Sequence, residues 1–399
     1  MLYMVRSVIR KLPGIVIKAV PLPAPEVISG AGTRKQAGAL CRKNGVKRAL
    51  IVTDQTLFSL GLHEKVVASL TEQGVCCSVF SDISSEPNLA IIDSGRKALN
   101  DFQADAVVAL GGGAVMDSCK MIAAGGRLKK RKSKALLYKI LIVPKKTLPI
   151  IAIPTTAGTG AEITVGAVVT NGKSQKKCFV IAGLNVKSVI LDSELTQKAP
   201  KSITCACGID ALSHGLEGVA ADVRSSGDDL RKSMECVRLT LENLPILIRE
   251  PDRLEARQNM CLAALYGGNA INKQLAGYVH AFAHSIGAKY HLSHGNAIAL
   301  SLLPVMRFQK KTCLHNLAEL SRYCKLALPS DDDEAAADRL LNEIQKLIDL
   351  CAFQGEKLRI PRKDYKSIAR AVSLDSINYS PPIVLKNRHI YTILDEISR

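Results

Sequence analysis

The chain has 399 residues, of which 47% are hydrophobic and 23% charged, and its formal net charge is +18. This length exceeds what one hydrophobic core usually supports, and the composition excludes a disordered or fibrous protein, so we expect two globular domains. No apolar run reaches the roughly 20 residues of a membrane-spanning helix. The sequence therefore predicts a soluble protein with no membrane span.

The positive charge is concentrated in two segments. Residues 1–48 carry ten Lys or Arg and one acid, and residues 127–146 carry nine Lys or Arg and no acid. These basic segments leave open an anion- or nucleic-acid-binding protein as a distant alternative. Nucleic acid is not the expected partner, because the chain has no Trp and only 4% aromatic residues for base stacking. We expect residues 127–146 to form a solvated surface insertion.

The cysteines and the N-terminal segment indicate the cellular compartment of the protein. Twelve cysteines are scattered without a CxxC pair, which favours free thiols in a reducing compartment over disulfides or a zinc ribbon. The first twenty residues lack the long apolar segment and cleavage site of a secretory signal. We therefore expect a cytoplasmic protein. The mitochondrial matrix is the alternative, because this segment contains arginines and no acid.

Short apolar runs alternate with helical stretches in the first half of the chain. Strands are predicted at residues 48–53, 75–80, 106–110 and 149–153, where β-branched or apolar residues are continuous. Helical spans at 61–73 and 89–102 separate them. This alternation predicts an α/β domain over residues 1–195, with a parallel sheet covered on both faces.

The strand pattern is lost after about Thr196. Amphipathic helical spacing follows, over residues 225–250, 252–273, 333–353 and 363–374. We therefore expect an all-helical second domain over residues 196–399, which makes the fold class α/β + all-α.

Two loops follow predicted strands and are rich in small or hydroxyl residues. The first places three glycines between a strand and a helix, where the backbone and the helix N-terminus can approach a phosphate: Gly111, Gly112 and Gly113. The second supplies hydroxyl donors at the carboxyl end of a strand, where open α/β sheets bind ligands: Thr155, Thr156 and Thr159. A structural turn remains the alternative for each loop.

Asp54 closes the first predicted strand. A carboxylate at this position could accept hydrogen bonds from the adenosine ribose and repel a 2′-phosphate, which would favour NAD over NADP. The alternative is an ordinary helix cap.

Five of the eight histidines fall in two short stretches: His214, His280, His284, His291 and His294. Asp210 and His214 are four residues apart, and so are His280 and His284, so each pair shares one face of a helix. This clustering predicts a metal site. One carboxylate with several imidazoles suits Fe(II), Zn(II) or a similar divalent ion, and the spacing does not choose among them.

Together these segments resemble the iron-containing (group III) alcohol dehydrogenase family. The resemblance rests on four motifs in the family's order, over residues 25–385: GGGAVMDSCK, PTTAGTGAEIT, GIDALSHGLEG and HAFAHSIGAKYHLSHGNAIA. It implies a Rossmann-like nucleotide-binding domain followed by a helical metal-binding domain, a dehydroquinate synthase-like architecture, with a cofactor cleft between them.

The resemblance also implies roles for individual residues. The metal ligands would be Asp210, His214, His280 and His294, and His284 would be catalytic, near the nicotinamide and the substrate. The cofactor would contact Asp54, Asn88, Gly111, Gly112, Gly113, Ala114, Asp117, Thr155, Thr156, Thr159 and Lys176.

Several positions depart from the family pattern. Ala114 replaces a serine, which removes one hydroxyl near the pyrophosphate, and Ser293 replaces the proline before the last ligand histidine. Gly166 presents no side chain where the family often has one facing the substrate. None of these changes removes a metal ligand.

The function implied is reversible hydride transfer between a small alcohol and NAD, with Fe(2+) or Zn(2+), in a homodimer. His284 would receive the released proton. A hydroxyacid–oxoacid transhydrogenase on the same fold is the closest alternative, and a lyase of the dehydroquinate-synthase type is a more distant one. The sequence does not identify the alcohol or aldehyde.

Overall fold

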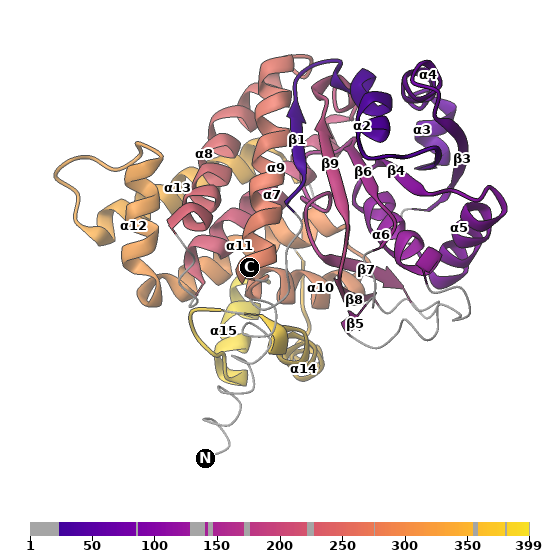
Figure 1. Ribbon diagram of the computed structural model, residues 1–399. Helices are drawn as coiled ribbons and strands as arrows, with labels where there is room; N and C mark the ends of the chain where they lie inside the picture. The colour runs from indigo at the N-terminus through magenta and orange to yellow at the C-terminus, as the bar shows by residue number, and fades with distance from the viewer. Residues whose placement is uncertain are drawn as a thin grey trace. The chain divides into compact units, whose positions relative to one another are not determined.

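The computed structural model describes residues 24–84, 87–127, 140–142, 147–170, 176–221, 227–274, 276–353, 358–379 and 381–398 (Figure 1). The predicted insertion at 127–146 therefore lies largely outside the described residues, and so do residues 1–23 of the basic segment at 1–48. The residue contacts group Val20–Ala199 into one unit and Pro200–Arg399 into a second. This boundary lies four residues after the predicted one, between residues 195 and 196.

The first unit contains a six-stranded parallel sheet in the order β1-β9-β6-β4-β2-β3. The four predicted strands are confirmed, and the sheet is completed by β1 and β9. The strand bounds are β1 (Glu26–Ser29), β2 (Arg48–Asp54), β3 (Cys76–Ile83), β4 (Ala106–Gly111), β6 (Ile150–Pro154) and β9 (Val186–Leu191).

The central strands β2, β4 and β6 are buried on both faces, which explains their continuous apolar sequences. Residues of α2 and α4 join one side of the strands in a hydrophobic core, and α5 packs on α6 where Gly95 faces Ile122. The helices of this unit are α2 (Ala37–Lys43), α3 (Gln55–Ser59), α4 (Glu64–Glu72), α5 (Leu89–Asp101) and α6 (Gly113–Arg127), with short 3-10 turns η1 (Thr33–Gln36) and η3 (Ser193–Leu195).

The strand order reverses between β2 and β4, because the chain goes from β2 outward to β3 and then from β4 outward through β6 to β9. In open parallel sheets, ligands bind outside the carboxyl ends of the strands at such a reversal. Asp54 ends β2 and Gly111 ends β4, so both lie at this favoured edge.

A second, three-stranded sheet in the order β5-β8-β7 was not predicted. Its strands are β5 (Ile140–Ile142), β7 (Gly166–Thr170) and β8 (Lys176–Ala182), and β7 pairs antiparallel with β8. In β7 the buried Ala167 and Val169 flank the exposed Val168. Five residues of alternation give too short a pattern to stand out beside the continuous runs of the main sheet.

The described residues of the second unit form helices and contain no strand. The predicted helices correspond to α8, α9, α13 and α14. The helix bounds are α7 (Lys201–Ala220), α8 (Gly227–Arg249), α9 (Leu254–Gln274), α10 (Tyr278–Tyr290), α11 (His294–Gln309), α12 (Leu314–Tyr323), α13 (Asp333–Leu350), α14 (Tyr365–Asp375) and α15 (Asn387–Ile397), with 3-10 turns η4 (Lys310–Thr312), η5 (Arg362–Asp364) and η6 (Ser376–Asn378). No helix among the described residues has the length and apolar character required to cross a membrane.

Candidate functional site

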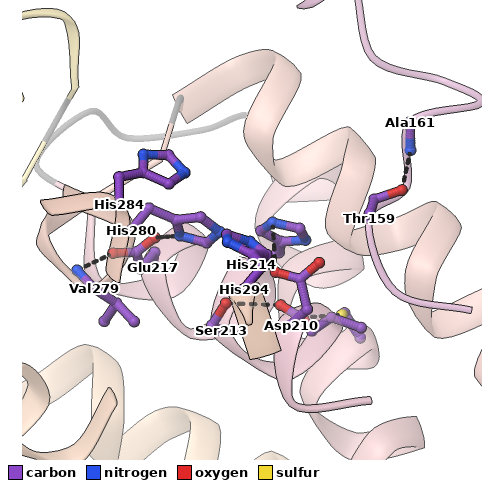
Figure 2. A network of polar contacts seen from close by, with 12 residues as sticks. Thr159, Ala161, Asp210, Ser213, His214, Glu217, Val279, His280, His284 and His294 are labelled. Atoms are coloured by element: carbon purple, nitrogen blue, oxygen red, sulfur yellow. Dashed lines mark hydrogen bonds and ion pairs between the residues drawn. The ribbon is translucent and has the colours of Figure 1, made fainter. Parts of the chain in front are cut away.

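The histidine cluster is built on three helices of the second unit (Figure 2). Asp210 and His214 lie one turn apart on α7, whose residues from Gly208 to Ala220 are all buried. His280 comes from α10, and His294 is the first residue of α11. A helix buried on every side is normally apolar, so a carboxylate and an imidazole inside it need partners.

The three imidazoles surround one oxygen of Asp210. The distances from Oδ1 are 3.5 Å to His214 Nε2, 3.6 Å to His280 Nε2 and 3.3 Å to His294 Nε2. The tightest group, with ligand atoms all within 4.8 Å of one another, is formed by Asp210, His280 and His294. His214 stacks on His280, with ring centroids 4.7 Å apart. It lies outside this tightest group, although its Nε2 is 3.5 Å from Asp210 Oδ1.

These atoms fit a divalent ion. Asp210 Oδ1 and His280 Nε2 are buried and have no hydrogen-bond partner among the residues that the structure describes. Ligands about 2.0–2.2 Å from a tetrahedral metal are roughly 3.3–3.6 Å from each other, which matches the separations around Asp210 Oδ1. Nitrogen and carboxylate donors suit Fe(II) and Zn(II) better than Mg(II) or Ca(II).

The cluster has an unusual charge distribution. Burial alone would raise the pKa of Asp210, but His214 and His294 hold it well below its ordinary value. Burial lowers the pKa of His214 to about 4. Burial acts in the same direction on His280, but the Glu217 and Asp210 carboxylates outweigh it and raise its pKa to about 10. A metal ion would have to displace the proton from His280, because only the neutral imidazole is a ligand.

Glu217 orients His280 and was missed by the sequence analysis. Its Oε2 lies 2.6 Å from His280 Nδ1, and its Oε1 accepts a hydrogen bond of 2.7 Å from the Val279 N–H. A β-carbon on Gly277 would lie only 2.5 Å from Oε1, so only glycine leaves room for this carboxylate. The available signal was spacing: Glu217 follows Asp210 by seven residues, which places both on one face of α7.

His284 lies beside the cluster and has a separate partner. Its Nδ1 is 2.9 Å from Asp375 Oδ2, and its ring is 5.5 Å from that of His294 and 6.0 Å from that of His280. Burial lowers the pKa of His284, and the Asp375 hydrogen bond opposes this shift. No sequence pattern indicated Asp375, which is 91 residues away from His284.

The turn between α10 and α11 positions His294. His291 ends α10 in the left-handed conformation, with φ 57°, and it is not part of the tight metal-ligand group. Ser293 caps α11, since its side chain accepts a hydrogen bond from the Asn296 N–H. Ser293 therefore starts the helix by side-chain capping.

The glycine and threonine loops touch each other in the first unit. The Thr155 N–H donates to the Gly111 carbonyl at 3.1 Å, where β4 and β6 end side by side. A β-carbon on Gly113 would lie 2.9 Å from Thr159 Cγ2, so the close approach of the loops requires glycine. Gly113 also begins α6, whose first N–H groups lack intrahelical partners and suit a phosphate.

Asp117 is bonded within the protein. Its Oδ1 accepts from Lys120 Nζ at 3.0 Å and its Oδ2 accepts from the Val168 N–H at 2.9 Å. Lys120 is buried and also donates to Thr164 Oγ1 at 3.0 Å and to the Gly166 carbonyl at 2.6 Å. Asp117 thus ties the start of α6 to β7, in addition to any contact it makes with a cofactor.

Asp54 and Asn88 are helix caps. Asp54 Oδ1 accepts from the Leu57 N–H at 2.9 Å, at the start of α3. Asn88 Oδ1 accepts from the N–H groups of Ala90 and Ile91, at the start of α5. Thr156 faces Gly112, and Thr159 Oγ1 accepts from the Ala161 N–H. The side chain of Lys176 lies outside the described residues.

Comparison with known proteins identifies the same family in both units. The family model "Iron-containing alcohol dehydrogenase" matches residues 24–193, and the model of the Fe-containing alcohol dehydrogenase family, C-terminal, matches residues 204–398. The NAD-dependent methanol dehydrogenase of Bacillus methanolicus is 31% identical over 327 residues, which cover 81% of this chain and 84% of that protein.

Two solved structures agree in fold over nearly the whole chain. The crystal structure of a 1,3-propanediol oxidoreductase has a TM-score of 0.87 and 26% identity, and covers 95% of this chain and 99% of its own. The sulfoacetaldehyde reductase of Bifidobacterium kashiwanohense, solved in complex with NAD+, has a TM-score of 0.85 and 26% identity, with coverage of 95% and 98%. The chain therefore belongs to the iron-containing alcohol dehydrogenase family and is an oxidoreductase.

Proposed function

We propose that this enzyme transfers hydride reversibly between a small alcohol and NAD, with a divalent ion, Fe(2+) or Zn(2+), held by Asp210, His214, His280 and His294. The observation that carries the proposal is the approach of three imidazole nitrogens to one buried carboxylate oxygen, at 3.3–3.6 Å. When bound, the ion supplies Lewis acidity, which lowers the pKa of an alcohol oxygen.

Residues of the chain would carry out the remaining steps. Glu217 holds the His280 ring in one orientation, with Nε2 directed at the cluster. His284 would accept the proton of the alcohol at Nε2, because its Nδ1 is occupied by Asp375. Loss of hydride from the carbon that carries this oxygen yields an aldehyde or ketone and reduces NAD.

We propose that NAD binds at the edge of the parallel sheet where β2 and β4 end. The N–H groups at the start of α6, with Gly111, Gly112, Gly113 and Ala114, would hold the pyrophosphate. Asp54 would accept hydrogen bonds from the adenosine ribose through Oδ2, since Oδ1 is used by the helix cap. Other contacts would come from Asn88, Asp117, Thr155, Thr156, Thr159 and Lys176. The negative charge of Asp54 disfavours the 2′-phosphate of NADP.

A panel of small alcohols and diols, tested with NAD and NADP on iron-loaded and zinc-loaded protein, tests the proposal. We expect NADH to accumulate steadily with at least one alcohol. His280→Ala should lose the metal, whereas His284→Ala should keep it and turn over more slowly. A full metal content in His280→Ala would defeat the assignment of ligands. Turnover that requires a second, oxoacid substrate would instead identify a transhydrogenase.

We further propose a cytoplasmic homodimer. The eleven cysteines among the described residues are all free thiols, which fits a reducing compartment. The dimer rests on family resemblance. Light scattering of the purified protein tests the dimer, and fractionation of cells tests the compartment.

A further inference from the structure

The contact between His284 and Asp375 belongs to the way α14 packs on α10. At one end, Asp364, just before α14, accepts from Tyr290 Oη at 2.9 Å and pairs with Lys289 Nζ at 3.1 Å. At the other end, Asp375, the last residue of α14, meets His284 in the middle of α10. The two helices thus run in opposite directions, and the two aspartates are eleven residues apart, which is about three helical turns.

Stability does not explain the aspartate at position 375. The side chains of His284 and Asp375 are 37% and 35% exposed, and ion pairs with this exposure contribute little to stability. The helix is already held by the buried Ile368, Ala369 and Val372 and by Asp364. The contact with His284 therefore points to a role in the chemistry.

The geometry fixes which nitrogen of His284 carries the proton. A carboxylate can only accept, so the 2.9 Å contact requires a proton on Nδ1. In the neutral ring, Nε2 then carries the lone pair. None of the residues that the structure describes forms a hydrogen bond with Nε2, so this atom is free to receive a proton.

We propose that Asp375 is a positioning residue, which holds His284 in the Nδ1–H tautomer and so keeps Nε2 ready to accept the alcohol proton. This inference rests on the proposed function, in which His284 receives that proton. Proton transfer by a positioned side chain typically contributes about a hundredfold to ten-thousandfold to the rate, and the loss of its orientation removes part of this. Asp375 itself would touch neither substrate nor cofactor.

Asp375→Asn is the main test, because an amide can donate to Nδ1 and so favour the wrong tautomer. We expect kcat for alcohol oxidation to fall about tenfold to a hundredfold, part of what a positioned general base contributes, while the KM values, the metal content and the thermal unfolding temperature stay close to wild type. Asp375→Glu should recover part of the loss, since it keeps an acceptor. Asp364→Asn is the matched control, because it loosens the same helix pair without contacting His284, and should leave kcat unchanged.

Two comparisons separate this inference from the proposed function. In the His284→Ala background, Asp375→Asn should cause no further loss of kcat. If His284→Ala slows turnover but Asp375→Asn does not, or if Asp364→Asn slows it equally, the positioning role is wrong and the proposed function stands. If His284→Ala turns over like wild type, the proton-accepting role itself is wrong, and the catalytic consequence of Asp375 is lost with it.

Nitrogen-15 NMR of the zinc-loaded protein reads the tautomer without turnover. The His284 signals are identified by their absence in His284→Ala, and protonated and unprotonated ring nitrogens have well-separated shifts. We expect the proton on Nδ1 in the wild type and a shift of the population toward Nε2–H in Asp375→Asn. A wild-type ring protonated on Nε2, or an unchanged tautomer in Asp375→Asn, overturns the inference.

Discussion

Glu217→Gln is the substitution that most directly tests how the metal centre is assembled. The side chain keeps its shape, but it can no longer accept from both the Val279 N–H and the His280 Nδ1–H. If the amide oxygen accepts from the Val279 N–H, the amide nitrogen faces His280 Nδ1 and donates to it. The proton of His280 is then driven to Nε2, the nitrogen needed for ligation. If the amide is reversed, its NH2 group opposes the N–H of Val279.

The size of the effect follows from the role of Glu217 as the partner of a ligand. Loss of such a partner costs about tenfold to a hundredfold in metal affinity, which is about 1.4–2.7 kcal/mol. The stabilisation of the folded protein by bound zinc should fall by the same amount, since it depends on the ratio of free metal to the dissociation constant.

Zinc affinity is measured by competition with a chelator, and thermal unfolding is followed at a fixed free zinc concentration. Glu235→Gln is the matched control: Glu235 pairs with Arg238 and accepts from Tyr323, and its described contacts include no residue of the cluster. Its loss should leave zinc affinity unchanged. Zinc binding by Glu217→Gln within twofold of wild type would refute the argument that this carboxylate selects the tautomer of His280.

Three further outcomes are expected. Asp192→Ala should destabilise the first unit by about 3–5 kcal/mol in urea unfolding. The reason is that Asp192 is a buried carboxylate that pairs with Arg34 Nη1 at 2.7 Å and accepts from three backbone N–H groups. A loss of stability below about 1 kcal/mol would contradict this. Asp54→Asn should raise kcat/KM with NADP relative to NAD, and an unchanged ratio would argue against ribose contact. Burial raises the pKa of Glu162 to about 7 from 4.5, so between these pH values the folded state retains a proton that the unfolded state releases. The free energy of unfolding should therefore fall by up to about 3 kcal/mol as the pH rises from 4.5 through 7. In Glu162→Gln this pH dependence should vanish.

The parts of the fold that could be predicted are those in which one sequence pattern continues over many consecutive residues. The central strands β2, β4 and β6 are continuous apolar runs because both faces are covered. The small sheet with β7 and β8 escaped prediction because a five-residue strand with one exposed position carries little signal.

The same distinction applies to the histidine cluster. Asp210 and His214 could be paired from sequence, because a spacing of four places them on one helical face. Glu217 follows Asp210 by seven residues, about two helical turns, and could have been found in the same way. Asp375 could not, because its contact with His284 depends on how two separate helices pack. Sequence spacing thus finds residues that share an element, whereas orienting partners from other elements require the structure.

The binding roles proposed for the two helix-capping residues, Asp54 and Asn88, are compatible with their structural roles. Among the described residues, Asp54 caps α3 with Oδ1 alone, so Oδ2 can still accept from a ribose hydroxyl. Asn88 also caps with its oxygen, which accepts from Ala90 and Ile91. What remains is its NH2 group, which can only donate. The cap therefore restricts the chemistry available for binding: Asn88 can recognise a phosphate or a carbonyl oxygen, and Asp54 can recognise a hydroxyl group.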